Sequence, residues 1–145
     1  MIKIALCDDN EVERRLLRKI VTAVLRELHQ EVLIVEFSSG EKLQRNFSRG
    51  DYDLIFLDVF MKEMDGIATG RAIRKKDVKV EIILATGSDQ YLREGYELHA
   101  FAYLMKPYDV MQVRATICDY FSRNQVSTHD EDMEFLRFSV QQKKF

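Results

Sequence analysis

Five apolar, strand-like runs alternate with helical segments along the chain. The runs cover residues 2–7, 31–37, 53–57, 80–85 and 101–105. Helical segments are expected over residues 11–29, 38–47, 67–76, 89–98 and 109–123. Strands that alternate with helices of this length predict right-handed crossovers and a parallel sheet with helices on both faces. The expected fold class is therefore α/β, with a doubly wound, five-stranded parallel sheet.

The first helical segment is expected to turn one apolar stripe toward the sheet. Asp9 and Asn10 precede the segment, and a side chain of this kind caps a helix start. Apolar residues then recur at helical spacing. The stripe consists of Val12, Leu16, Ile20, Ala23 and Val24.

Residues 124–145 break the alternation of strands and helices. Residues 124–132 are polar and acidic, which is typical of a linker. Residues 133–145 then alternate apolar positions at Phe135, Phe138 and Val140. We favour a strand that begins a second, truncated domain, and the alternative is a tail that packs locally. The expected organisation is one domain over residues 1–123, followed by a linker and the start of another domain over 124–145.

Composition narrows the class of protein without naming a function. The chain has 145 residues, of which 46% are hydrophobic and 32% charged, as expected for a globular domain. A formal net charge of −2 gives no general attraction to nucleic acid or to an anionic membrane. Cys7 and Cys118 lie in apolar runs without metal-ligand spacing, so we expect buried thiols in a reducing cytoplasm.

Polar side chains end four of the five apolar runs. They are Asp8 and Asp9, Asp58, Thr86 and Lys106. The carboxyl ends of parallel strands share one edge of a sheet, so these five side chains should meet in one pocket. Taken singly, the aspartates could be helix caps and the threonine a buried strand end. The recurrence at four strand ends favours a functional site.

Three carboxylates held this close would raise one another's pKa unless a cation neutralised them. An oxygen-only ligand set suits a hard cation. A set that leaves room for water and phosphate oxygens suits Mg²⁺, with Mn²⁺ as a substitute. Zinc is not expected, because no cysteine or histidine joins the cluster.

A metal-binding carboxylate site beside a lysine is suited to phosphoryl transfer. A carboxylate can act as the nucleophile and become an aspartyl phosphate. Lys106 would neutralise the transferred group, and the Thr86 hydroxyl would donate to one of its oxygens. Pro107, the single proline, follows the lysine directly. A cis Lys106–Pro107 bond would fix the direction of the ammonium, whereas the alternative is a proline that merely ends the strand.

Five motifs spread over residues 1 to about 123 together resemble one known family. They are Cys-Asp-Asp at 7–9, Leu-Ile-Phe-Leu-Asp at 54–58, Met-Asp-Gly at 64–66, Ala-Thr-Gly at 85–87 and Tyr-Leu-Met-Lys-Pro at 103–107. This set resembles the CheY-like receiver domain of bacterial two-component response regulators. The resemblance implies a flavodoxin-like (βα)5 fold, a cytoplasmic protein and a sensor histidine kinase as partner. It also implies a switch that catalyses only its own phosphorylation and dephosphorylation.

The resemblance also implies a role for each matching residue. Asp58 would be the phosphoacceptor, Lys106 the phosphate-binding lysine, Thr86 the switch hydroxyl and Tyr103 the rotating aromatic. The metal ligands would be Asp9 directly, Asp8 through water, Asp58, and the backbone carbonyl of Phe60. The Phe60 side chain departs from the small or polar residues often found at this position, which leaves open how well water reaches the phosphoryl group.

Two stretches and the tail indicate a subfamily. Residues 87–91 and 100–107 resemble regulators that carry a LytTR-type DNA-binding domain, and residues 135–145 are similar to its first strand. The resemblance implies transcription regulation, with DNA contacted only through the missing C-terminal domain. One alternative is a receiver that acts by protein contact alone. A Mg²⁺-dependent phosphatase of the haloacid-dehalogenase type is disfavoured. That family has Asp-x-Asp after its first strand, with the nucleophile there, whereas here the first strand ends in the adjacent pair Asp8-Asp9 and the lone Asp58 follows the third strand.

A surface for self-association is expected on the fourth helix, the fifth strand and the fifth helix. Thr86 and Tyr103 border this face, so a change at the pocket would reach it. Tyr91, Gly95 and Leu98 share one helical stripe, and Tyr108, Met111 and Cys118 share another. We expect a phosphorylation-dependent homodimer with Tyr91, Leu98 and Met111 in its interface. The alternative is that these residues complete the core.

Overall fold

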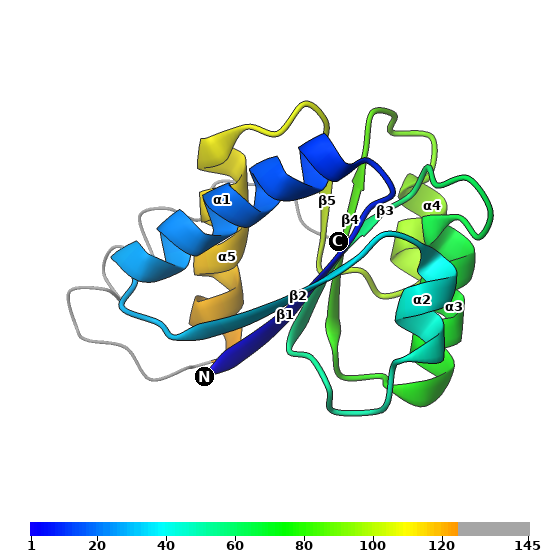
Figure 1. Cartoon of the computed structure of the whole chain (residues 1–145), viewed down its shortest axis with the longest axis horizontal. Helices are drawn as coiled ribbons and strands as arrows, with labels where there is room; N and C mark the ends of the chain where they lie inside the picture. Colours follow the sequence, from blue (N-terminus) through cyan, green and yellow to red (C-terminus); the bar gives the residue numbers. More distant parts are fainter. Residues whose placement is uncertain (125–145) are drawn as a thin grey trace.

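The computed structural model describes residues 1–124, in which a parallel sheet lies between two layers of helices (Figure 1). The elements in chain order are β1 (Ile2–Cys7), α1 (Glu11–Glu27), β2 (Val32–Phe37), α2 (Gly40–Arg45), β3 (Leu54–Asp58), α3 (Gly66–Lys76), β4 (Glu81–Thr86), α4 (Leu92–Glu97), β5 (Ala102–Met105) and α5 (Val110–Asn124). The expected strands and helices are therefore all present. The linker and second-domain strand were expected over residues 124–145; Asn124 instead ends α5, and residues 125–145 lie outside the described residues.

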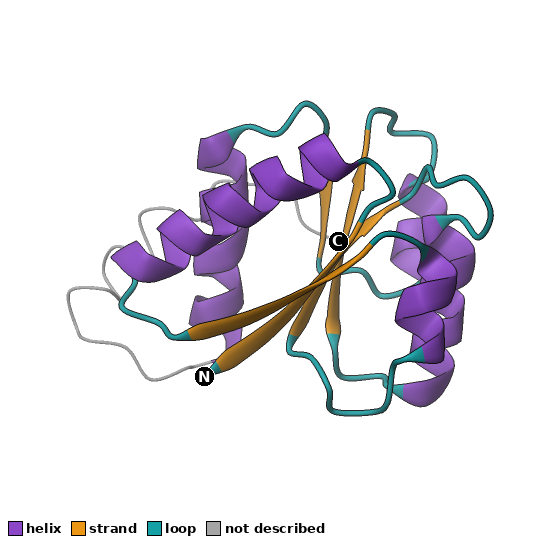
Figure 2. Cartoon of the chain, viewed as in Figure 1, coloured by secondary structure: helices purple, strands orange, loops and turns teal. Residues whose placement is uncertain are grey.

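The sheet has the strand order β2-β1-β3-β4-β5, and every neighbouring pair is parallel. Helices α1 and α5 cover one face, and α2, α3 and α4 cover the other (Figures 1 and 2). This arrangement confirms the predicted doubly wound α/β fold. The chain reverses its direction of travel across the sheet between β1 and β3. In such a sheet, the carboxyl ends of the two strands at the reversal form a ligand-binding crevice.

The central strands are buried on both faces, which explains their nearly continuous apolar sequences. In β1, Ile4 and Leu6 belong to the apolar cluster under α1 and α5. Ala5 and Cys7 alternate with them and belong to the cluster under α2, α3 and α4. This alternation is the period of two expected of a strand. Both cysteines are buried, as expected.

The buried face of α1 differs from the expected stripe. The helix begins after Asn10, whose side chain accepts a hydrogen bond from the Glu13 N–H, so the cap is confirmed. Val12 and Leu16, however, are 78% and 46% exposed, and Ala23 is also exposed. The buried residues are Leu17, Ile20, Val21, Val24 and Leu25.

Arg14 explains the shifted register of α1. Its guanidinium turns inward and donates to the Asp8 carbonyl oxygen at 2.7 Å and to the Glu36 carboxylate at 2.8 Å. The first turn of α1 therefore presents a polar side chain to the sheet. The apolar face begins one turn later, at Leu17.

Two polar residues at the amino edge of the sheet organise the backbone there. Asp77 is buried and accepts three backbone N–H groups, from Lys79 at 2.9 Å and from Gly50 and Val80 at 3.0 Å. Burial alone would raise the pKa of Asp77, but these donors outweigh it and lower the pKa. The second residue is Arg74, and burial lowers the pKa of its guanidinium.

Arg74 binds carbonyl oxygens from three parts of the chain. Its guanidinium donates to Leu98 at 2.7 Å and to His99 at 3.2 Å, directly after α4, and also to Asp77 and Val80. Helix α4 is shorter than expected and begins after Tyr91, which makes no side-chain cap hydrogen bond. The carboxyl end of α4 is thus tied to α3 and to the start of β4.

No helix within residues 1–124 has the length and apolar character required to cross a membrane.

Candidate functional site

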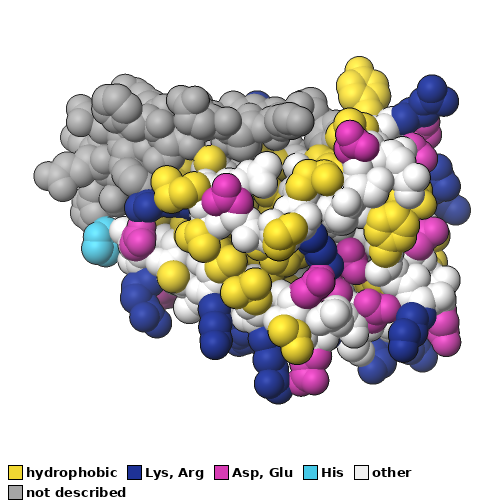
Figure 3. All heavy atoms as spheres, turned by 90° about the horizontal axis from the view of Figure 1, so that it is seen from above, with side chains coloured by type: hydrophobic (Ala, Val, Ile, Leu, Met, Phe, Trp, Pro, Cys, Tyr) yellow, Lys and Arg dark blue, Asp and Glu magenta, His cyan; other side chains and the backbone are white. Residues whose placement is uncertain are grey.

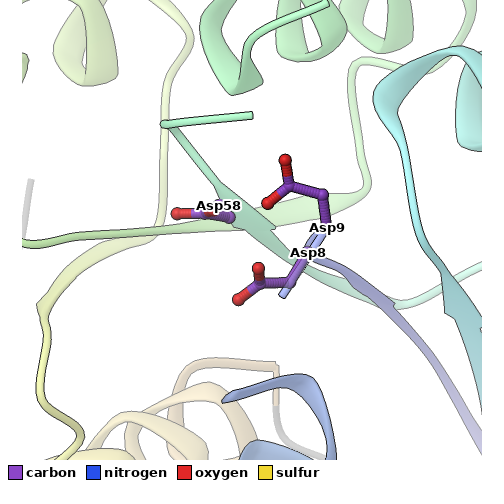
Figure 4. Close-up of side chains that lie close together, drawn as sticks. All are labelled: Asp8, Asp9 and Asp58. Carbon is purple, nitrogen blue, oxygen red and sulfur yellow. The ribbon is translucent and has the colours of Figure 1, made fainter. Parts of the chain in front are cut away.

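Three carboxylates meet where β1 and β3 end, at the reversal of the sheet (Figure 4). One oxygen each from Asp8, Asp9 and Asp58 lies within 4.8 Å of the others. Asp8 and Asp58 are only 3% and 5% exposed. The convergence expected from the strand ends is therefore observed for all three aspartates.

Backbone groups fix the orientation of the first two carboxylates. The Asn10 N–H donates to Asp8 Oδ1 at 2.8 Å, and the Lys62 N–H donates to Asp9 Oδ2 at 3.1 Å. The N–H of Lys62 comes from the loop between β3 and α3, so this loop is tied to the end of β1. Each aspartate keeps its other oxygen for a further partner.

Lys106 provides the positive charge at this edge. Its Nζ lies 2.9 Å from Asp8 Oδ2 and 3.3 Å from Asp58 Oδ1, and it also contacts the Glu13 carboxylate. Burial alone would lower the pKa of Lys106, but the hydrogen bonds that its ammonium donates to Glu13 and Asp8 outweigh burial and raise the pKa. The ammonium is therefore charged at neutral pH. The bond to Pro107 is cis, as considered from the sequence.

Asp58 is the carboxylate whose charge is least well compensated. Its pKa is raised to about 7, first by burial and then by the neighbouring charge of Asp8. Lys106 opposes the shift without cancelling it. One ammonium thus faces more negative charge than it can neutralise, which is the electrostatic signature of a cation site.

The donor set fits a magnesium ion. Oxygen ligands lie about 2.0–2.1 Å from Mg²⁺, so two ligands on opposite sides of the ion are about 4.2 Å apart. The three carboxylate oxygens lie within 4.8 Å of one another, a separation compatible with ligands of one ion. Mn²⁺ accepts the same oxygen ligands.

The expected role of the Phe60 carbonyl as a metal ligand stays a prediction. The Phe60 side chain is 47% exposed and packs edge-on against Tyr91.

Thr86 and Tyr103 both contact Ser88, in the loop that joins β4 to α4. Thr86 is fully buried at the end of β4, and its Oγ1 accepts a hydrogen bond from the Ser88 N–H at 3.4 Å. Tyr103 is 5% exposed and its hydroxyl donates to the Ser88 carbonyl oxygen at 2.7 Å. One loop residue therefore connects the Thr86 hydroxyl at the end of β4 to the Tyr103 ring on β5.

The expected self-association residues divide between surface and core. Met111 is 64% exposed and Tyr91 is partly buried. Leu98 is only 4% exposed, so its assignment to the surface was wrong. The side of α4 that carries Leu98 faces α3, where Gly70 lets it approach: a Cβ at Gly70 would lie 2.7 Å from Leu98 Cδ1. Cys118 and Gly95 are buried as well.

Glu13 and Arg14 belong to the site but carry no distinguishing pattern in the sequence. Both lie in the first turns of α1, where charged residues are common. Tyr108 is a third such residue, because its ring lies 5.9 Å from Lys106 Nζ and burial raises its pKa. The sequence signal for these three residues is their position alone: they follow the polar residues that end the first and the last strand.

Comparisons with known proteins agree with the geometry of the site. Residues 4–118 match the family model of the response regulator receiver domain. The chain is 30% identical over 124 residues to the transcriptional regulatory protein NatR of Bacillus subtilis, covering 85% of this chain and 51% of NatR. It is 26% identical over 126 residues to the sensory transduction protein LytT of Bacillus anthracis, covering 86% of this chain and 49% of LytT. The chain thus spans about half the length of these relatives.

Solved structures match the described fold over nearly its whole length. The receiver (REC) domain of AraT, a response regulator from Geobacillus stearothermophilus, has a TM-score of 0.72 and 26% identity. The match covers 86% of this chain and 95% of that domain. A two-component response regulator from Clostridium difficile has a TM-score of 0.73 at 22% identity, covering 87% of this chain and all of the other, which supports the fold alone.

Proposed function

This chain belongs to the response regulator receiver domain family, and we propose that it is a switch whose Asp58 accepts a phosphoryl group from a histidine kinase. The observation that carries the proposal is the placement of Asp58. Its carboxylate is buried, lies 3.3 Å from Lys106 Nζ, and shares one cluster with Asp8 and Asp9. A buried carboxylate between a lysine and two further carboxylates is placed for phosphoryl transfer.

In the reaction, an Asp58 oxygen attacks phosphorus and forms a P–O bond while the P–N bond of the phosphohistidine breaks. The bonding pair leaves with the histidine nitrogen. Lys106 neutralises the phosphoryl oxygens. The Thr86 hydroxyl donates its proton to one of them, because the hydrogen bond from the Ser88 N–H occupies only a lone pair of Oγ1. Asp8, Asp9 and Asp58 would hold Mg²⁺, which when bound neutralises the carboxylates and the transferred group. The protein catalyses this transfer and the later hydrolysis of its own aspartyl phosphate.

Phosphorylation with acetyl phosphate and Mg²⁺ tests the nucleophile. Intact-protein mass spectrometry of the wild type is expected to show one added phosphoryl group. Asp58→Asn is expected to remove it, because the amide is not a nucleophile. Asp109→Asn is the control, since Asp109 is exposed and should be labelled as the wild type. Persistent labelling of Asp58→Asn would show that another residue accepts the group.

The output we propose is control of transcription. The relatives are regulators of the NatR, LytR and LytT type, which belong to the LytTR subfamily. DNA would be contacted through a C-terminal LytTR-type domain, and the kinase phosphotransfer would take place in the cytoplasm. A receiver that acts by protein contact alone is the second candidate. The coding sequence beyond Phe145 distinguishes the two.

A homodimer that forms on phosphorylation is the third part of the proposal. The face of α4, β5 and α5 exposes apolar side chains at Leu92, Tyr96, Met105, Val110 and Met111. Seen from above the view of Figure 1, exposed hydrophobic side chains lie among acidic and basic ones (Figure 3). A change in the contacts of Thr86 and Tyr103 with Ser88 would reach this face through the loop before α4.

A further inference from the structure

Glu13 is a charged partner of Lys106 that lies outside the carboxylate cluster. Its carboxylate contacts Lys106 Nζ from the first turn of α1. The Glu13 side chain is 39% exposed, whereas those of Asp8 and Asp58 are 5% and 6% exposed. Glu13 therefore stands at the rim of the site, with water on one side and the ammonium on the other.

The ammonium of Lys106 has no proton to spare for a phosphoryl group. A lysine ammonium carries three N–H donors. Three carboxylates already surround it, those of Asp8, Asp58 and Glu13. A phosphoryl oxygen on Asp58 can reach Lys106 only if one of these contacts is given up.

Glu13 is the contact that can be released at the lowest cost. Asp8 is buried, and its other oxygen is held by the Asn10 N–H, so its side chain cannot turn away toward solvent as that of Glu13 can. Asp58 itself carries the phosphoryl group. The exposed carboxylate of Glu13 can exchange the ammonium for water.

We propose that Glu13 is a positioning residue that competes with the phosphoryl group for Lys106 and thereby restrains phosphorylation of Asp58. This inference rests on the proposed function and names a regulator of the same site. In the unphosphorylated protein, Glu13 holds the lysine and ties the start of α1 to the loop after β5. Phosphorylation transfers the lysine to the phosphoryl oxygens and releases α1 from that loop.

The test compares Glu13→Gln with Glu11→Gln. Both substitutions remove one negative charge from the first turn of α1, but Glu11 pairs with Arg15 on the outer side of the helix. Glu13→Gln is expected to increase the rate of labelling by acetyl phosphate and the affinity for beryllofluoride by about fivefold. This corresponds to about 1 kcal/mol, the upper value for a partly exposed ion pair. Glu11→Gln is expected to change neither, and circular dichroism should show that both variants are folded.

A Lys106→Met background shows whether the effect passes through the lysine. There, Glu13→Gln is expected to leave labelling and beryllofluoride affinity unchanged. Equal increases from Glu13→Gln and Glu11→Gln would reduce the effect to overall charge and overturn the proposal. A decrease for Glu13→Gln, or an increase that persists without Lys106, would overturn it too. Labelling of Asp58→Asn, or no labelling of the wild type, would instead overturn the proposed function and this inference with it.

Discussion

Gly66 is the position where a single methyl group should disturb the site most. It starts α3 directly behind the end of β3, and its N–H donates to the Val59 carbonyl oxygen at 2.9 Å. A Cβ at this position would lie 2.1 Å from the Asp58 carbonyl oxygen and 2.8 Å from Val59 Cα. Both obstacles are backbone atoms, which cannot rotate out of the way. The Met-Asp-Gly motif thus has glycine at this position because the backbone leaves no room for a Cβ atom.

The expected cost of Gly66→Ala follows from this overlap. Ordinary contacts begin at 3.4 Å, so the methyl group and the carbonyl oxygen would be about 1.3 Å too close. Forcing additional atoms into a packed region usually costs about 1–3 kcal/mol, and rigid obstacles put this site at the upper end. A loss of about 3 kcal/mol lowers the melting temperature of a domain of this size by on the order of 10 °C. A shift of about 1 Å in a reacting group can slow a reaction by about 100-fold.

Gly87→Ala is a matched control, since a Cβ at Gly87 would meet no described atom within 4 Å. Melting followed by circular dichroism and labelling by acetyl phosphate measure the two effects. We expect Gly66→Ala to lose both stability and labelling, and Gly87→Ala to keep the melting temperature. If the two variants melt within 2 °C of each other and are labelled equally, the steric reasoning is wrong.

Three further predictions concern the metal, the amino edge and the dimer face. Asp9→Ala is expected to raise the Mg²⁺ concentration needed for labelling more than Asp8→Ala, because a direct ligand contributes more than one acting through water; equal effects in a Mg²⁺ titration would contradict these roles. Asp77→Ala is expected to lower the free energy of unfolding, measured in urea at pH 7, by about 2–4 kcal/mol, because it leaves backbone N–H groups without an acceptor. Since folding lowers the pKa of Asp77, this difference should shrink as the pH falls below about 3.9, and a constant difference would refute it. Met111→Glu is expected to abolish a beryllofluoride-induced dimer in sedimentation without lowering stability, whereas Leu98→Glu should unfold the domain by burying a charge; a dimer that survives Met111→Glu would exclude this face.

The sheet and the carboxylate cluster were predictable because local patterns determine them. Strands buried on both faces have nearly continuous apolar sequences, and their carboxyl ends must share an edge. Asp8, Asp9 and Asp58 therefore follow from sequence position alone. The roles expected for Thr86 and Tyr103 stay predictions, although both residues contact the same loop.

The features missed from the sequence depend on contacts between distant segments. Arg14 turns the first turn of α1 inward because it finds partners at the end of β1 and on β2, and this displaced the expected apolar stripe. Leu98 is buried because Gly70 on α3 leaves room for it. Glu13 meets Lys106 across 93 positions of sequence. No periodicity within either segment records such a pairing.

The two ends of α4 are held very differently, and this fixes how the helix can tilt. Its carboxyl end is anchored by the guanidinium of Arg74 on the carbonyl oxygens of Leu98 and His99, and by the buried Leu98 side chain. Its amino end follows Tyr91, without a side-chain cap, beside the loop that Thr86 and Tyr103 contact. A displacement of that loop would therefore tilt α4 about its anchored carboxyl end at Arg74. The largest movement would fall on the first turn, at Leu92, and the smallest at the amino edge of the sheet.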